Sequence, residues 1–294
     1  MRAALLPERA VIRILGEDAR HFMQGLVTSD VESLAPGAAR FAALLTPQGK
    51  ILFDFIVIAV ADDEGGGFVL DAPRALESAL AERLGFYKLR AKVEIARRPD
   101  LAVAVSLDGA PSDDLGLVYR DPRHEKLGTR IVLPAEGAEA ALRAAGFALA
   151  DAAAWQQRRI ALGVPEGGQD FTYGDTFPHE ADMDQLGGVD FAKGCFVGQE
   201  VVSRMEHRAS VRTRVVPIAY EHAAPLSGVE VKIGERAAGF LGSTAEGRGL
   251  AKVRLDRVEE GLAANETLSA GNVPIRLVKP DWAKFPFPGE AAKS

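Results

Sequence analysis

Cysteine is almost absent from this sequence, since Cys195 is the only one in 294 residues. A single cysteine excludes an intrachain disulfide and any metal site built from several thiolates of one chain. One thiol is also typical of a reducing compartment, and we expect a cytoplasmic protein. The open alternatives for Cys195 are a nucleophile, a redox-sensitive thiol, a ligand shared with a second molecule, or a small buried residue.

Long apolar runs and an excess of positive charge are absent as well. The longest apolar run, residues 51–60, contains Asp54 and is too short to span a bilayer. The uninterrupted apolar run before Pro7 is only four residues long, too short for the core of a signal peptide. The formal net charge of −6 gives no general attraction to nucleic acid or to anionic membranes. We therefore expect neither as a direct partner.

The remaining composition is that of a soluble globular protein, with 47% hydrophobic and 26% charged residues. Residues 1–97 alternate short β-rich runs with helical segments such as Arg74–Leu84, and residues 98–208 do the same. Residues 209–294 contain short β-like runs between glycines and no helix of convincing length. The patterns predict an α+β protein with two mixed units and a small C-terminal β-barrel.

The stretch from 164 to 190 has no periodicity and is rich in glycine, and an ordered loop of this length is usually functional. It leads into residues 193–200, which read KGCFVGQE and contain the lone cysteine. Lys193 lies two residues before Cys195, and a helix can begin at Gly198. A cation and a helix N-terminus both favour a thiolate over a thiol, so this segment predicts a functional thiol.

Other segments accompany this octapeptide, namely residues 15–30, Thr46–Lys50, Tyr87–Arg90 and 159–180. Together they resemble the folate-binding YgfZ/IBA57-like proteins, relatives of the aminomethyltransferase (T-protein) of the glycine cleavage system. The octapeptide is the most specific of these matches. The resemblance covers residues 11–204, and the β-rich remainder fits the family's third domain by position and pattern only.

The resemblance implies a three-domain clover-leaf ring whose central opening holds a tetrahydrofolate. It also implies a role in assembling or repairing iron–sulfur clusters of [4Fe–4S] enzymes, with an indirect link to tRNA modification. The expected partners are a reduced folate and iron–sulfur assembly or client proteins, and we expect a monomer. The functional thiol motif would consist of Cys195 and Lys193, supported by Gly194, Phe196, Gly198, Gln199 and Glu200.

The resemblance also implies folate contacts. Glu180 matches the position of a pterin-binding glutamate, and Tyr173 and Phe177 are candidate walls; a solvated loop acid and loop packing are the alternatives. Residues 193–214 carry five basic and two acidic side chains, and Arg204 and Arg208 could receive the anionic tail of a folate, unless the cluster is a solvated face. The five histidines show no metal-ligand spacing, so we expect no stably bound metal.

One departure from the T-protein pattern concerns an Asp-Asp pair after the first hairpin. Here the first position of that pair is Phe53, and Asp54 remains as a lone acid that could face out of the hairpin. Without the first carboxylate, aminomethyl transfer lacks its best proton-handling group. The pattern favours a folate-binding accessory protein. A folate-dependent aminomethyltransferase or demethylase, and a thiol-redox module with a vestigial folate site, are the alternatives.

Overall fold

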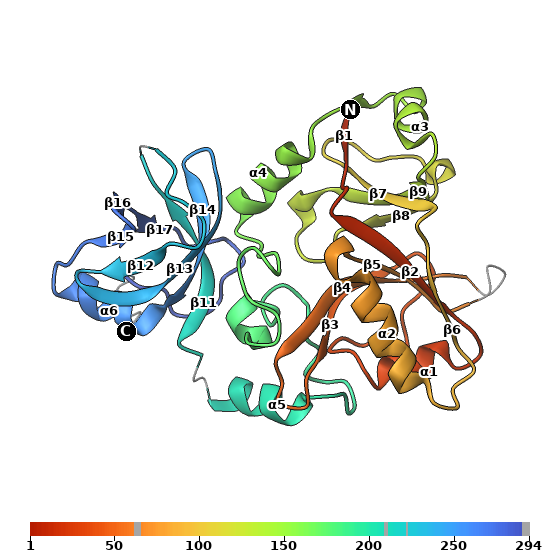
Figure 1. Cartoon of the computed structure of the whole chain (residues 1–294), viewed down its shortest axis with the longest axis horizontal. Coiled ribbons are helices and arrows are strands. Elements are labelled where there is room, and N and C mark those ends of the chain that lie inside the picture. Colours follow the sequence, from red (N-terminus) through yellow and green to blue (C-terminus); the bar gives the residue numbers. More distant parts are fainter. Residues whose placement is uncertain (62–65, 209–210, 222, 290–294) are drawn as a thin grey trace. The chain divides into compact units, whose positions relative to one another are not determined.

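The computed structural model describes residues 1–61, 66–208, 211–221 and 223–289, except for the side chain of Arg208 (Figure 1). The chain divides into two compact units. Unit 1 comprises Met1–Trp155 and Gly187–Gln199, and unit 2 comprises Gln156–Leu186 and Glu200–Ser294. The loop that carries Cys195 therefore belongs to unit 1, and the segment that carries Glu180 belongs to unit 2.

The first sheet of unit 1 is antiparallel and has the strand order β3-β4-β5-β2-β6. Its strands are β2 (Arg9–Leu15), β3 (Ala39–Leu45), β4 (Ile51–Ala59), β5 (Phe68–Pro73) and β6 (Glu94–Arg97). Helix α1 (Ala19–Gln24) follows β2, and α2 (Glu77–Lys88) packs on β2 and β6. The helix predicted from Arg74 begins as a short 3-10 turn, Arg74–Leu76, before α2.

The second sheet of unit 1 has the order β10-β1-β7-β9-β8. Its strands are β1 (Arg2–Leu5), β7 (Leu101–Ser106), β8 (Leu117–Arg120), β9 (Thr129–Pro134) and β10 (Ala148–Leu149), and α3 (Ala138–Ala144) lies between β9 and β10. The first strand of the chain thus pairs with β7 and β10. The sheets therefore do not follow the expected ranges 1–97 and 98–208.

A buried cluster joins the two sheets of unit 1. Apolar side chains from both, including Val11 and Ile58 from the first and Val103 from the second, form one core. A buried ion-pair network lies in the same layer: Arg9 pairs with Asp71 at 2.6 Å within the first sheet, and Arg130 of β9 pairs with Asp71 across the two sheets. Removal of one partner would leave a buried charge unpaired, so this network disfavours separation of the two sheets.

Unit 2 contains most of α4 (Ala152–Leu162), the 3-10 helix η5 (Pro178–Ala181), most of α5 (Gln199–Arg208) and a seven-stranded sheet that curls into a nearly closed barrel. The barrel strands are β11 (Thr213–Ala219), β12 (Glu230–Ile233), β13 (Arg236–Ala245), β14 (Arg248–Arg254), β15 (Leu268–Ala270), β16 (Val273–Pro274) and β17 (Arg276–Leu277). The α+β class and the C-terminal barrel are confirmed.

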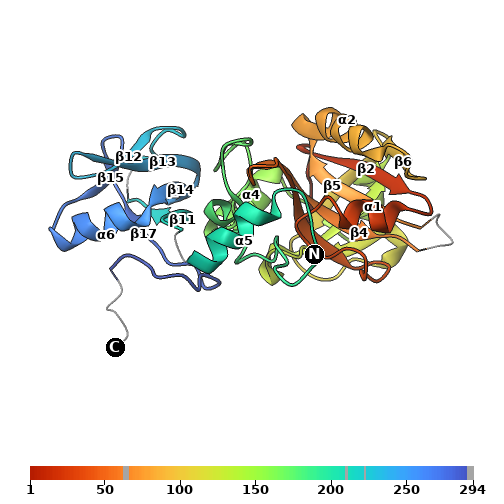
Figure 2. The same cartoon turned by 90° about the horizontal axis from the view of Figure 1, so that it is seen from below.

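The barrel also contains a helix that the sequence pattern did not predict. Helix α6 (Leu255–Ala263) packs against β11, β12, β13 and β14 (Figure 2). Its Gly261 approaches the barrel so closely that an added Cβ would lie 2.1 Å from a side-chain carbon of Ile233. A short helix with an internal glycine resembles a turn in sequence, which is why the expectation of no helix was wrong.

No helix in the described ranges is both long enough and apolar enough to cross a membrane.

Candidate functional site

The segment of residues 187–199, here called the thiol loop, is fixed to unit 1 at its start. The hydroxyl of Thr28 donates to the carbonyl of Gly188 at 2.5 Å, and the backbone N–H of Asp190 donates to the carbonyl of Thr28 at 2.9 Å. The Asp190 carboxylate then accepts from the N–H groups of Ala192 and Lys193. These contacts define the backbone path just before the cysteine.

Lys193 anchors the middle of the thiol loop. Its Nζ donates to the carbonyls of Gln24, Val27 and Ser29 at 2.8, 2.6 and 3.0 Å, and the residue is only 9% exposed. Burial lowers the pKa of this ammonium to about 8, although nearby carboxylates oppose the shift. The sequence predicted Lys193 as a cationic neighbour of the thiol, whereas the structure gives its ammonium an anchoring role that spacing alone could not reveal.

Cys195 is exposed, whereas Lys193 before it and Phe196 after it have buried side chains. Phe196 is 8% exposed, its ring lies 5.3 Å from Nζ of Lys193, and Val197 packs against the core of the first sheet. Cys195 and Gly194 instead face solvent. The alternative of a small buried cysteine is therefore excluded, because the loop buries Lys193 and Phe196 and leaves the thiol at the surface.

Gly198 fixes the end of the thiol loop. Its φ is +82°, and a Cβ there would lie 2.6 Å from the carbonyl oxygen of Thr46 and 3.0 Å from Cα of Gly49. Residues 46–50 form the turn between β3 and β4, so two segments of the family resemblance pack on each other. Helix α5 begins at Gln199, directly after Gly198, which confirms the predicted helix start.

The segment of residues 164–186, here called the carboxylate loop, is fixed within unit 2 by buried arginines. Arg159 is fully buried, and its Nη1 donates to Asp170 at 2.6 Å and to the carbonyl of Val164 at 2.8 Å. Asp170 also accepts from the N–H of Ser243 in β13 at 2.8 Å. This loop is therefore tied to both α4 and the barrel.

Glu180 lies in η5 within the carboxylate loop. Its Oε2 accepts from the N–H of Phe177 at 3.0 Å and from Nζ of Lys252 at 3.3 Å, and its side chain is 19% exposed. Glu180 is therefore an oriented, largely buried carboxylate, not a freely solvated loop acid. No contact to its Oε1 is present among the described residues, which makes that oxygen available to a ligand.

The aromatic residues of this loop pack mainly on the loop itself. Tyr173 lies edge-on to Phe171 with ring centroids 5.5 Å apart, and it covers Gly167 so closely that a Cβ there would meet the tyrosine oxygen at 2.1 Å. Phe177 is half-buried and caps η5. Tyr173 and Phe177 thus have packing roles, and their contact with a ligand stays a prediction.

Several basic side chains of residues 193–214 already have partners within their own unit. The buried ammonium of Lys193 donates to backbone carbonyls. The buried guanidinium of Arg214 forms a bidentate ion pair with Asp184 at 2.6 and 2.9 Å. Arg204 pairs with Glu200 at 2.6 Å. Arg208 ends α5, and its side chain lies outside the described residues. Lys193 and Arg214 are thus not available to an anionic ligand, and reception of a folate tail by Arg204 and Arg208 stays a prediction.

The fold brings together three possible metal ligands that the sequence spacing did not indicate. One ligand atom each of His179, Asp184 and Glu206 lies within 4.8 Å of the others, and Nε2 of His179 is 3.1 Å from Glu206. Asp184 is already neutralised by Arg214. We therefore assign no metal ion to this group.

Phe53 and Asp54 lie in β4, the second strand of the first hairpin, and both are buried. Phe53 is 7% exposed and belongs to the core of the first sheet. Asp54 is 5% exposed, so the expectation that it could face out of the hairpin is wrong. Its burial in unit 1 is consistent with the electrostatic attraction between Asp54 and the nearby buried Arg9.

Comparison with known proteins places this arrangement in a family. The iron-sulfur cluster assembly factor IBA57, mitochondrial, of Homo sapiens is 30% identical over 278 residues, covering 88% of this chain and 75% of the human protein. The Mus musculus protein of the same name is 30% identical and covers 94% of this chain and 84% of its own length. The chain belongs to the IBA57 family. The resemblance seen in the thiol motif is thereby confirmed.

Two further comparisons support the fold of this IBA57-family chain. The model for the CAF17 C-terminal β-barrel domain matches residues 212–285. The crystal structure of glycine cleavage system aminomethyltransferase T from Bartonella henselae has a TM-score of 0.74 at 17% identity, covering 97% of this chain and 87% of that one. The T-protein fold is therefore shown.

The family also corrects the expected location. The relatives are named as mitochondrial proteins, which contradicts the expectation of a cytoplasmic protein. The expectation rested on a single cysteine and on the lack of apolar runs, and neither feature distinguishes one reducing compartment from another.

Proposed function

We propose that this chain takes part in the assembly or repair of iron–sulfur clusters and that Cys195 is the group that acts. The named role of its IBA57 relatives supports the process. The observation that carries the role of Cys195 is its exposure between the buried Lys193 and Phe196. A loop fixed on both sides of one exposed thiol presents it to a second molecule without the entropy cost of ordering a flexible segment.

The cluster in this proposal is cargo that passes through the site. Iron–sulfur clusters are held by about four ligands, of which one chain with one cysteine supplies a single thiolate. The other ligands would come from thiols of an assembly partner, from glutathione, or from a client protein whose cluster is exposed during repair. The isolated chain should therefore carry no stable cluster.

We further propose that the chain binds a reduced folate through Glu180. A pterin presents paired N–H donors, and the oriented carboxylate of Glu180, with Oε1 available, fits that need. A bound tetrahydrofolate would supply one-carbon or reducing chemistry. The aromatic residues of the carboxylate loop fit a flat ligand less clearly, because Tyr173 already covers Gly167.

This proposal does not include aminomethyl transfer. The resemblance to T-proteins matches Phe53, a core residue of the first sheet, to the first carboxylate of their Asp-Asp pair, so this chain would lack that proton-handling group. Purified chain incubated with tetrahydrofolate and an aminomethyl donor should form no methylenetetrahydrofolate above the uncatalysed background. Turnover at ordinary enzymatic rates, about 1 per second or faster, would show that the alternative function is the right one.

The test of the central role uses cells that lack the protein and show reduced activity of [4Fe–4S] enzymes. Cys195→Ser should fail to restore that activity, whereas Ala192→Ser, an exposed change in the same loop, should restore it. Because Cys195 is exposed, its substitution should leave the melting temperature unchanged, which separates lost function from lost folding. Full restoration of activity by Cys195→Ser would contradict the role of Cys195 and leave folate binding as the proposed function.

A further inference from the structure

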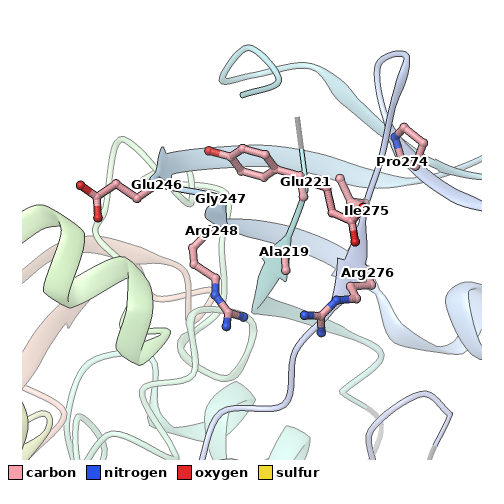
Figure 3. Close-up of a pocket in the computed structure, with 9 residues that line it drawn as sticks. Ala219, Glu221, Glu246, Gly247, Arg248, Pro274, Ile275 and Arg276 are labelled. Carbon is pink, nitrogen blue, oxygen red and sulfur yellow. The ribbon is translucent and has the colours of Figure 1, made fainter. Parts of the chain in front are cut away.

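The C-terminal barrel carries a pocket of about 580 Å³ where β14 and β17 flank β11 (Figure 3). Arg248, Ala219 and Arg276 line it from the three neighbouring strands. The pocket lies wholly within unit 2, and neither Cys195 nor Glu180 lines it. It is therefore separate from the groups used in the proposed function.

The strand register places two arginines on either side of one small residue. Ala219 pairs with Arg248 of β14 on one side and with Arg276 of β17 on the other. Directly opposed residues project from the same face of a sheet, and two strand spacings separate the two arginine Cα atoms by about 10 Å. Figure 3 shows both guanidinium groups extending to the same side of the strands. The side chains of Arg248 and Arg276 are long enough for both guanidinium groups to contact one anion between them.

Neither of these arginines has a partner in the part of the chain that the structure describes. Arg248 and Arg276 are both exposed, and no ion pair or hydrogen bond links either side chain to another described residue. Other barrel arginines behave differently, since Arg236 pairs with Glu266 at 3.1 Å and Arg254 with Asp256 at 2.6 Å. Two unpaired like charges that share a face are unfavourable unless something negative lies between them.

The nearest acid along the chain is held away from this pair. Glu246 precedes Arg248 in the turn between β13 and β14, where Glu246 and Gly247 have φ values of +47° and +76°, typical of a tight hairpin turn. The Glu246 carboxylate accepts from the side chain of Gln157 at 3.0 Å, and Figure 3 shows it directed away from Arg248. A second acid, Glu221, also lines the pocket just beyond the end of β11, and no ion pair between it and either arginine is present among the described residues.

Apolar groups complete the wall of the pocket. Pro274 and the largely buried Ile275 line it beside the methyl group of Ala219. A guanidinium fork matches a carboxylate or a phosphate group, and the apolar wall suits a small organic body attached to it. We propose that this pocket binds a small organic anion, a phosphate monoester or a dicarboxylate, with its charged group between Arg248 and Arg276.

The test titrates the full chain with α-glycerophosphate and with succinate at constant ionic strength, followed by calorimetry. At least one of the two should bind saturably, and whichever binds identifies the source of the oxyanion. Arg248→Gln and Arg276→Gln should each weaken that binding about tenfold, the usual effect of losing one charge-assisted contact. Arg236→Gln removes the same charge from the same barrel outside the pocket and should bind like the wild type.

A second variant separates loss of the site from loss of the fold. Ala219→Glu places a carboxylate between the two arginines, so it should abolish anion binding while keeping or raising the melting temperature. Two results would overturn the proposal: no saturable binding of either probe at tens of millimolar, or binding that the pocket variants and Arg236→Gln weaken equally. The second result would indicate only a general response to net charge.

Discussion

The thiol loop and the carboxylate loop are neighbours in sequence, yet they are fixed by different means. The thiol loop is held by one buried lysine on backbone carbonyls and by one glycine in a tight contact. The carboxylate loop is held by the buried arginines Arg159 and Arg214, each paired with aspartates. In both loops the buried basic side chains anchor the backbone. The proposed functional groups, the thiol of Cys195 and Oε1 of Glu180, are the atoms left available to another molecule.

The largest expected effect lies in the carboxylate loop. Arg159→Met leaves Asp170 buried without its partner, and breaking a buried pair in this way costs about 3–5 kcal/mol. Chemical denaturation should report this loss in the free energy of unfolding. A loss below about 1 kcal/mol would mean that the arginine does not hold this loop.

The matching test in the thiol loop is Gly198→Ala. The positive φ and the approach to the carbonyl of Thr46 should together cost about 2–4 kcal/mol. Gly194→Ala is the control in the same loop, because a Cβ at that position meets nothing within 4 Å. Equal stability of Gly198→Ala and Gly194→Ala would contradict the role of Gly198 in holding the thiol loop.

Lys193→Met tests the polar half of the thiol loop anchor. The substitution leaves three carbonyl groups without their donor and should lower the free energy of unfolding by about 1–3 kcal/mol. The melting temperature of the purified variant checks this, and an unchanged value would contradict the anchoring role.

The difference in free energy of unfolding between the wild type and Lys193→Met should also depend on pH. The pKa of Lys193 in the folded chain is about 8 and its ordinary value is 10.5, so between these values the unfolded chain binds more protons. The free energy of unfolding of the wild type, relative to Lys193→Met, should therefore rise from pH 8 to 10.5. A difference that falls across this window would show that the ammonium is not desolvated.

The smallest effect on stability is expected for Glu180→Gln. Loss of its partly exposed ion pair with Lys252 should cost less than about 1 kcal/mol, whereas affinity for tetrahydrofolate should fall about tenfold. Lys252→Met removes the same ion pair but keeps the carboxylate, so calorimetric titration of both variants separates the two roles. Equal weakening by both variants would count against a direct contact of Glu180.

The sequence predicted the mixed strands and helices of unit 1, the barrel and the helix after Gly198, because these depend on local apolar patterns and glycine positions. It did not predict the pairing of β1 with β7 and β10, which joins segments about 100 or more residues apart. It did not predict the anchoring roles of Lys193 and Arg214, since their partners are distant in sequence: Lys193 contacts carbonyls near α1 and Arg214 contacts aspartates of the carboxylate loop. The sequence also could not predict whether Cys195 is exposed, because residue spacing along an irregular loop does not determine which side chains are buried. Helix α6 was missed because its internal glycine imitates a turn.

The most direct test of the central claim is the alkylation of Cys195 in the native chain, followed by mass spectrometry. An exposed thiol on a fixed loop should react at a rate within about tenfold of the same thiol in denatured chain at equal pH. Gly194→Ala should leave the native rate unchanged, because this change meets open space. A thiol that is protected in the native state and reacts only after unfolding would contradict the account, because it would be a core residue.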